Sequence, residues 1–294
     1  MISLVQLGTI HYATGLRLQQ QLVALRKQEK IGDVLLILEH SPVITLGRNA
    51  KAANVIASPE LLAQRGVELF ECDRGGDVTF HGPGQIVGYP IFDLRGFSRE
   101  ATDAPSVLRK SLGAVDFVRR LEEVLIRTCA DFAISTKRVP GLTGVWTDVN
   151  PLSFRAKEND SQNRSLESRN LLFAGSAANP ASEAKLAAIG VHISRFVTSH
   201  GFALNVNTDL SYFNLIIPCG ITSKPVTSMQ QELGKLIELN AVTESISRNF
   251  GTVFSSQMLW VDTLDALLGH AVGVPMRRPA DLRQVHKEDD ITWA

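Results

Sequence analysis

The chain has 294 residues, of which 44% are hydrophobic, which is enough for a packed core in one large domain or two modest ones and excludes a disordered chain. Thirty basic residues balance thirty acidic residues, so the net charge is zero, and neither nucleic acid nor an anionic membrane is expected as the main partner. The three widely spaced cysteines form no CxxC pair, which argues against a zinc ribbon, a redox dithiol and a disulfide framework.

Neither a targeting segment nor a membrane span is predicted. Residues 1–7 carry no basic segment and no long apolar segment, so we expect no signal peptide and no transit peptide. The longest aliphatic run, Val34–Leu38, is too short to cross a bilayer. Three thiols in a chain of this length suit a reducing compartment. We therefore predict a soluble, cytoplasmic protein.

Hydrophobic spacing and turn residues predict a mixture of strands and helices. Leu18, Leu22 and Leu25 share one helical face, and Ser58 followed by Pro59 is typical of a helix start. In chain order we predict a strand at 3–7, a helix at 14–30, strands at 33–39 and 43–46, a helix at 59–65, strands at 67–71 and 86–92, a helix at 106–132, strands at 186–193 and 202–206, a helix at 242–253 and another across 258–268. Strands and helices do not alternate strictly, so we expect an α+β fold and not a doubly wound sheet.

Two segments differ in composition from the rest of the chain. Residues 150–184 are rich in Asn, Ser, Arg and Glu and lack periodicity, which predicts an inserted, mobile surface loop that is functionally passive. From about residue 272 the chain is polar, charged and contains proline, which predicts a loose tail. We expect a main domain over residues 1–255 and a C-terminal extension over 256–294, made of a helix and this tail.

The run Arg74–Gln85, with the sequence RGGDVTFHGPGQ, is the most informative segment of the chain. It contains four glycines, one proline, one arginine and one histidine. Glycine permits backbone angles that other residues avoid and allows a ligand to approach the main chain closely. We therefore expect a shaped loop between two strands, whose backbone meets a ligand, and no packed strand within it.

Cys219 is a candidate nucleophile. It follows an apolar run that ends at Pro218, and Gly220 comes next, a composition that can expose a thiol at the edge of a sheet. The alternative is a buried, inert cysteine, which is the commoner case and the one expected for Cys72 and Cys129. A nucleophilic thiol needs a base or a positive neighbour. The candidates are His81, His192, His200 and Lys185, and spacing alone does not choose among them.

Five ordered motifs carry a resemblance to a known family. They are RGGDVTFHGPGQ at 74–85, GVW at 144–146, KLAAIGV at 185–191, SHGFALNVN at 199–207 and PCG at 218–220. Over roughly residues 1–255, apart from the insert, the chain resembles the lipoyl(octanoyl) transferases. A single glycine-rich loop would be weak support, but five motifs in order are specific. The resemblance implies a biotin/lipoate protein ligase-like α+β catalytic domain.

The resemblance also implies a reaction and its residues. An octanoyl group would move from octanoyl-acyl carrier protein to a lysine of a lipoyl domain, with Cys219 carrying it as a thioester and Lys185 activating the thiol. As a base Lys185 would have to be partly desolvated, because an exposed ammonium is rarely neutral. Small residues would leave room for the acyl chain. The implied substrate-binding residues are Arg74, Gly75, Gly76, Asp77, Val78, Thr79, Phe80, His81, Ala188, Ile189, Gly190, Gly201, Phe202 and Ala203.

The implied partners are the acyl carrier protein as donor and, as acceptors, the lipoyl domains of 2-oxoacid dehydrogenase E2 subunits and the glycine cleavage H protein. No cofactor and no metal are implied, and we expect a monomer. Three alternatives stay open: an ATP-dependent lipoate or biotin ligase, an amidotransferase between lipoyl domains, and a non-catalytic protein that binds acyl groups or lipoyl domains. Phe80 departs from the family pattern, which often has tyrosine there, so a hydroxyl contact would be lost while the ring packing survives.

Overall fold

The computed structural model describes residues 1–97, 111–148, 183–220 and 224–268. The strands are β1 (Ile2–Ile10), β2 (Asp33–His40), β3 (Val43–Leu46), β4 (Glu68–Glu71), β5 (Val78–His81), β6 (Gln85–Ile91), β7 (Thr136–Val139), β8 (Leu142–Thr147), β9 (Lys185–Ser194), β10 (Val197–Asn205) and β11 (Met258–Trp260). The helices are α1 (Tyr12–Lys27), α2 (Pro59–Gln64), α3 (Ala114–Asp131), α5 (Met229–Leu233), α6 (Leu239–Val253) and α7 (Leu264–Leu268), with short 3-10 helices η1 (Ala52–Asn54), η2 (Leu94–Gly96), η4 (Leu210–Leu215) and η5 (Pro218–Gly220).

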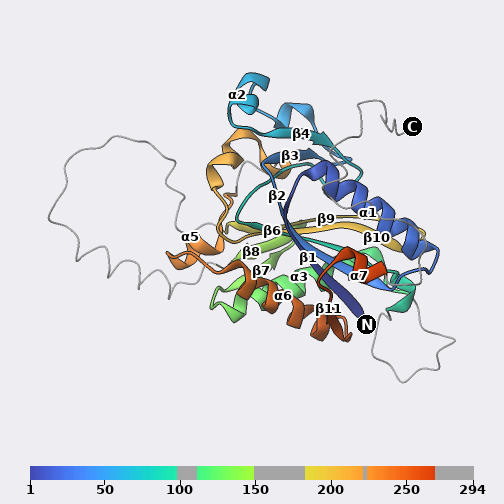
Figure 1. Cartoon of the computed structure of the whole chain (residues 1–294). Coiled ribbons are helices and arrows are strands. Elements are labelled where there is room, and N and C mark those ends of the chain that lie inside the picture. The colour runs from blue at the N-terminus through green and yellow to red at the C-terminus, as the bar shows by residue number, and fades with distance from the viewer. Residues whose placement is uncertain (98–110, 149–182, 221–223, 269–294) are drawn as a thin grey trace, which may run out of the picture.

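A large mixed sheet is the centre of the fold. Its eight strands run in the order β11-β1-β2-β6-β10-β9-β8-β7. β1 pairs in parallel with both β2 and β11, and the other pairings are antiparallel. Helix α1 covers one face, and α3 and α6 cover the other (Figure 1). This mixture of strand directions confirms the α+β fold class.

The composition of β2 follows from its central place between two layers. Leu35 and Ile37 point into the core beneath α3 and α6, and Val34, Leu36 and Leu38 point into the core beneath α1. Successive side chains of a strand alternate between faces, so a strand that is covered on both sides needs an unbroken apolar run. Val34–Leu38, the aliphatic run that is too short to cross a membrane, is therefore part of a buried central strand. Within the described residues, no helix is long and apolar enough to cross a bilayer.

A second sheet has three strands in the order β4-β3-β5, and its strand β5 is the centre of the glycine-rich run at 74–85. β5 pairs antiparallel with β3, and Ile44, Val78 and Phe80 share a small core with Leu62 of α2 and Leu215 of η4. The expectation of a continuous loop over 74–85 is therefore wrong at its centre. The sequence Val-Thr-Phe-His has the β-branched and aromatic residues that favour a strand. The glycines on both sides of these four residues make the whole run resemble a loop in the sequence.

Most elements predicted before residue 100 are confirmed, including the short helix after Ser58, whose hydroxyl accepts a hydrogen bond from the Leu61 N–H at 3.3 Å. Two later helices differ. The helix predicted at 106–132 starts at Ala114, since residues 111–113 are not helical and Gly113 has an extended backbone. Residues 106–110 lie outside the described residues. The helix predicted across 258–268 is limited to α7, because Met258–Trp260 pairs with β1 instead.

The predicted insert and tail fall mainly on residues that the structure does not describe. Residues 149–182 and 269–294 lie outside it. The last two residues of the predicted insert are described and belong to the sheet region, since the Ala184 N–H donates to Thr147 Oγ1 at 3.0 Å and Glu183 pairs with Lys137 at 3.0 Å. Glu183 and Ala184 are thus not part of a loose loop, and the rest of the predicted insert lies outside the described residues.

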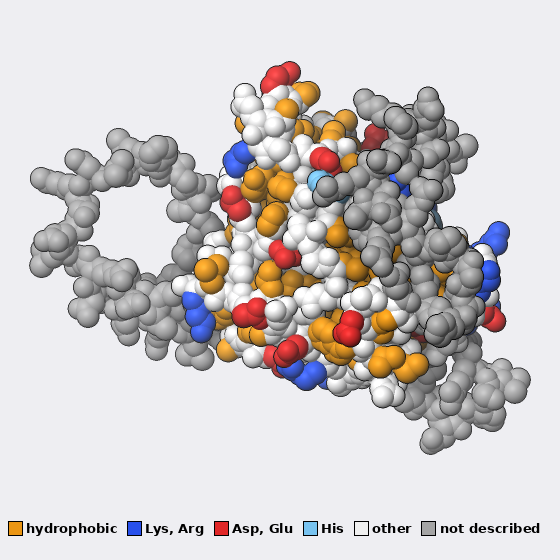
Figure 2. Space-filling model, in the orientation of Figure 1, with side chains coloured by type: hydrophobic (Ala, Val, Ile, Leu, Met, Phe, Trp, Pro, Cys, Tyr) orange, Lys and Arg blue, Asp and Glu red, His pale blue; other side chains and the backbone are white. Residues whose placement is uncertain are grey.

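The described surface mixes charges of both signs. Figure 2 shows acidic and basic side chains interspersed on the visible face, with hydrophobic side chains between them. This pattern matches the equal numbers of basic and acidic residues in the sequence.

Candidate active site

The first part of the glycine-rich run packs against β9. The Gly75 N–H donates to the Val191 carbonyl at 3.1 Å. A Cβ atom at Gly190 would lie 2.7 Å from the Gly75 oxygen, which is closer than real contacts allow. A glycine is therefore required at 190 for the loop to lie on the strand.

Arg74 is held inside the protein by its neighbours. Its guanidinium donates from Nη2 to the Thr45 carbonyl at 2.7 Å, from Nε to Thr45 Oγ1 at 3.2 Å and from Nη1 to the Gly75 carbonyl at 3.1 Å. The residue is 8% exposed. These bonds fix the loop and place the guanidinium in the wall of a pocket.

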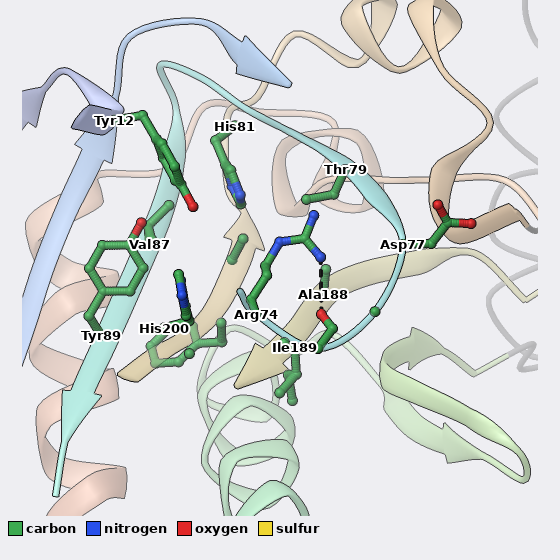
Figure 3. A pocket seen from close by; sticks show the side chains of 16 residues that line it. Tyr12, Arg74, Asp77, Thr79, His81, Val87, Tyr89, Ala188, Ile189 and His200 are labelled. Atoms are coloured by element: carbon green, nitrogen blue, oxygen red, sulfur yellow. Dashed lines mark hydrogen bonds between the residues drawn. The ribbon is translucent and has the colours of Figure 1, made fainter. Parts of the chain in front are cut away.

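Small residues from β9 and β10 form another wall of this pocket. Ala188 faces Ala203 and Gly190 faces Gly201 in the antiparallel register. A Cβ atom at Gly201 would lie 2.1 Å from the Gly88 carbonyl, so only glycine fits there. The full lining is Tyr12, Arg74, Gly75, Gly76, Asp77, Thr79, His81, Val87, Tyr89, Ala188, Ile189, Gly190, His200, Gly201, Phe202 and Ala203 (Figure 3).

Twelve of the fourteen predicted substrate-binding residues line this pocket, and Val78 and Phe80 do not. Their side chains alternate with those of Thr79 and His81 along β5 and point into the core of the small sheet. The Phe80 ring stacks on Tyr212 with centroids 4.7 Å apart. The ring packing expected for Phe80 is thus present.

Four lining residues were not among the predicted binding residues: Tyr12, Val87, Tyr89 and His200. Val87 and Tyr89 are two positions apart on β6, so they share a face, and His200 was considered only as a base. In Figure 3, Tyr12, Tyr89 and His200 lie on one side of the pocket and Asp77 lies on the other. The pocket thus has an aromatic end and an end at the glycine-rich loop.

The histidines at the aromatic end are neutral. His40 Nδ1 lies 3.0 Å from the Ile10 carbonyl, which only accepts, so Nδ1 carries the proton and Nε2 accepts from the Tyr89 hydroxyl at 2.6 Å. Burial lowers the pKa of His40 to about 4 and that of His81 to about 3. His40 and His81, whose rings lie against Tyr12, are therefore expected to be uncharged at neutral pH.

Asp73 joins two of the candidate bases behind the pocket wall. It accepts a hydrogen bond from His200 Nε2 at 2.7 Å and a very short one from His192 Nδ1. The bond from His200 holds the pKa of Asp73 well below its usual range. Arg48 Nη2 lies 3.1 Å from His192 Nε2. His192 and His200 are thus tied to a carboxylate and do not line the hollow described next.

A second hollow shares part of its wall with the pocket and is lined by Lys185. Its walls are Thr79, Gln85, Lys185, Ala188, Ala203, Asn205, Phe213, Pro218 and Val226, and it shares Thr79, Ala188 and Ala203 with the pocket. Lys185, at the start of β9, is 9% exposed. Of the four candidate bases, only Lys185 lines this hollow together with Pro218.

Cys219 is the middle residue of η5, next to Pro218, and its side chain lies outside the described part of the structure. The turn is anchored on η1. The Ile217 N–H donates to the Asn54 carbonyl at 2.7 Å, and Asn54 Nδ2 donates to Asp77 Oδ2 at 2.6 Å. Asp77 thereby links the glycine-rich loop to the segment that carries Cys219.

Gly220 lies close to the same carboxylate. Its φ is +65°, and a Cβ atom there would lie 3.1 Å from Asp77 Oδ2. The glycine of the Pro-Cys-Gly motif therefore permits both the left-handed turn and the approach to Asp77.

Known proteins match this chain over nearly its whole length. The family model "Lipoyl protein ligase A/B catalytic domain" matches residues 11–251. The octanoyltransferase of Koribacter versatilis is 54% identical over 289 residues, covering 98% of both chains. The octanoyltransferase of Acidobacterium capsulatum is 51% identical over 270 residues, covering 91% of this chain and 96% of the relative.

Solved structures show the same fold at low identity. A bi-partite lipoate protein ligase from Thermoplasma acidophilum has a TM-score of 0.58 at 13% identity, covering 92% of this chain and 89% of that one. A lipoate-protein ligase A bound with ATP has a TM-score of 0.55 at 11% identity, covering 92% and 91%. The identities to the curated relatives and the family match confirm the resemblance found in the sequence: the chain belongs to the octanoyltransferase family, which is built on the lipoyl protein ligase A/B catalytic domain.

Proposed function

We propose that this acyltransferase moves an octanoyl group from octanoyl-acyl carrier protein to a specific lysine of a lipoyl domain, and that the group rests on Cys219 as a thioester between the two transfers. The observation that carries the proposal is the hollow that Lys185 and Pro218 line together. A hollow shared by Lys185 and by the residue before Cys219 supports a role for this lysine as the base. The hollow also shares Thr79, Ala188 and Ala203 with the pocket of small residues, which is the proposed site of the acyl chain.

The first transfer exchanges one thioester for another. The Cys219 sulfur attacks the thioester carbonyl of the donor and its proton passes to Lys185. Lys185 then returns this proton to the phosphopantetheine thiolate of the carrier, which leaves as a thiol. Both sides contain one thioester and one thiol, so the step is nearly balanced in free energy and needs no ATP. Lys185 as an ammonium also favours the thiolate before attack.

The second transfer forms an amide. The acceptor lysine attacks the acyl carbon on Cys219, and Lys185 takes a proton from the attacking amine. Lys185 passes this proton to the departing Cys219 thiolate, which restores the thiol. Amide formation from a thioester is downhill. Two separate steps also allow the two protein partners to dock one after the other, which a direct transfer between two bulky proteins would not.

The proposal also gives the orientation of the octanoyl group in the pocket. The thioester carbon lies near Lys185 and η5, and the alkyl chain runs between Ala188 and Ala203 toward Tyr12 and Tyr89. The neutral state of His40 and His81 supports this direction, because an apolar chain next to an imidazolium would force a charge out of water. Arg74, Gly75, Gly76, Asp77, Thr79, His81, Ala188, Ile189, Gly190, Gly201, Phe202 and Ala203 are the proposed contacts.

The remaining expectations stay predictions. They are the E2 lipoyl domains and the glycine cleavage H protein as acceptors, a monomeric state, a cytoplasmic location, a catalytic domain over 1–255 and an extension over 256–294. For the last of these, β11 pairs with β1 inside the main sheet, so the first residues after 255 pack with the catalytic domain.

A reconstituted assay tests the proposed function. Purified chain, octanoyl-acyl carrier protein and an apo lipoyl domain are mixed without ATP, and the mass of the lipoyl domain is measured. We expect a gain of one octanoyl group with wild type and none above background with Cys219→Ala. Transfer that needs ATP and free octanoate would support a ligase instead, and equal transfer by Cys219→Ala would contradict the thioester route.

A further inference from the structure

Trp146 lies against Lys185, and nothing in the proposed reaction yet uses it. The Gly144-Val145-Trp146 motif is on β8, next to β9, and Trp146 is the register partner of Lys185. The indole is 1% exposed. The Lys185 Nζ lies 5.1 Å from the centroid of the ring, within the range of a cation–π contact.

Gly144 makes room for the stem of the same lysine. Its φ is +122°, and a Cβ atom there would lie 3.0 Å from Lys185 Cε and 2.5 Å from the Ala187 carbonyl. The Gly144 N–H donates to Glu122 Oε1 at 3.2 Å, which anchors this part of β8 on α3. The two outer residues of the motif thus contact Lys185 at different places, the glycine along the stem and the indole at the ammonium.

The other charged groups around this ring have partners of their own. Lys224 Nζ lies 5.8 Å from the Trp146 centroid and forms a very short salt bridge with Glu183, which also pairs with Lys137 at 3.0 Å. Behind Gly144, the buried Glu122 pairs with Arg119 at 2.7 Å and Arg138 at 3.1 Å. Glu183 and Glu122 thus each pair with other cations of the described residues.

We propose that Trp146 is a positioning residue, whose indole face holds the Lys185 ammonium at the hollow beside η5, with Gly144 admitting the lysine stem. The inference rests on the proposed function, in which Lys185 acts on Cys219. A ring face attracts an ammonium and not a neutral amine, and such a contact changes an equilibrium by roughly two-fold at an exposed site to thirty-fold at a desolvated one. Removing the ring should therefore weaken the influence of Lys185 on the thiol.

The test follows the reactivity of Cys219 in the full-length chain. Alkylation of Cys219 by iodoacetamide is measured across neutral and alkaline pH by peptide mass, and acylation is measured in single turnover with octanoyl-acyl carrier protein. For Trp146→Leu we expect both rates at neutral pH to fall about tenfold and the midpoint of the alkylation profile to move to higher pH. Trp146→Phe keeps a weaker ring face and should fall between Trp146→Leu and wild type.

Controls separate positioning from packing. Trp260→Leu removes a half-exposed indole on β11, away from this site, and should react like wild type. In the Lys185→Ala background, Trp146→Leu should have no further effect on alkylation, because the ring then has no ammonium to hold. If Trp146→Leu does not fold, Trp146→Met fills the site with a flexible apolar side chain and carries the same expectation.

Two results would overturn the inference: a folded Trp146→Leu or Trp146→Met chain with the wild-type alkylation profile, or an equal loss of rate on adding Trp146→Leu to Lys185→Ala. Failure of the proposed function gives a different pattern. In that case Lys185→Ala alone leaves the alkylation profile of Cys219 unchanged, whatever the Trp146 variants do.

Discussion

Asn54 connects three segments that the sequence separates widely, although no motif includes it. Its carbonyl accepts from the Ile217 N–H before Cys219, and its amide donates to Asp77 of the glycine-rich loop. Asp77 accepts two further hydrogen bonds, from the N–H groups of Val78 and Lys51. A hydrogen bond to an ionised group is stronger than one between neutral groups, so Asn54 is well placed to fix the turn that carries the nucleophile.

We predict that Asn54→Ala slows the acylation of Cys219 about tenfold, because a bond to a carboxylate is worth about 1.5–3 kcal/mol and its loss frees the turn from the loop. Single-turnover acylation measures this rate, and thermal unfolding checks the fold. Asn240→Ala is a matched control, because Asn240 is exposed and bonds only to Gln6 among the hydrogen bonds found for its side chain in the described residues. Acylation of Asn54→Ala at the wild-type rate would show that the hydrogen bond between Asn54 and Asp77 has no part in the reaction.

At this scale the sequence predicted residue types but not their neighbours. Spacing left His81, His192, His200 and Lys185 open as bases, and the family resemblance named Lys185. In the structure, Lys185 is the one of these four that lines a hollow with Pro218. Tyr12 is the first residue of α1 and is far from the motifs in sequence, so its place in the pocket depends on how α1 packs on the sheet. Contacts of this kind are set by tertiary packing, which periodicity does not report.

Strand β11 also depends on tertiary contacts that the sequence pattern does not reveal. Three residues are too few for a period to identify them, and their neighbours suggested a helix. They form a strand because β1 has an open edge: the Ile2 N–H donates to the Gln257 carbonyl at 2.8 Å and the Val261 N–H donates to the Leu4 carbonyl at 2.9 Å. Long amphipathic elements such as α1 and α6 were predictable, since their apolar stripe is a local property.

A truncation after residue 255 should therefore destabilise the protein. It removes β11, exposes the edge of β1 and removes Leu264, which is buried in the core beneath α1. We expect a lower Tm by circular dichroism than for the full chain. A chain that ends after residue 268 keeps both β11 and α7, which contains Leu264. This chain is the control, and we expect its Tm to be near that of the full chain. An unchanged Tm for the shorter truncation would mean that the catalytic domain is complete at 255.

The stability of the whole molecule should fall in mild acid. Burial lowers the pKa of His40 to about 4 and that of His81 to about 3, whereas an unfolded histidine titrates near ~6.5. Between about pH 6.5 and 4 the unfolded chain thus binds more protons than the folded one, so acid favours unfolding. Asp73, with its strongly lowered pKa, stays ionised over this range.

We predict that the free energy of unfolding decreases by up to ~1.4 kcal/mol per pH unit for each of the two histidines as the pH falls through this window. Urea denaturation at a series of pH values measures the slope. His40→Gln should flatten it, whatever its effect on stability at neutral pH, and the exposed His11→Gln should not. A slope that His40→Gln leaves unchanged would show that His40 is not the group that takes up the proton on unfolding.

The intact mass of the protein shows whether Cys219 carries an octanoyl thioester. The full chain is mixed with octanoyl-acyl carrier protein, without ATP and without an acceptor. We expect a gain of one octanoyl group that hydroxylamine removes, that Cys219→Ala lacks and that an apo lipoyl domain discharges. An adduct that persists in Cys219→Ala, or transfer to the lipoyl domain with no adduct on the enzyme at any time, would contradict it.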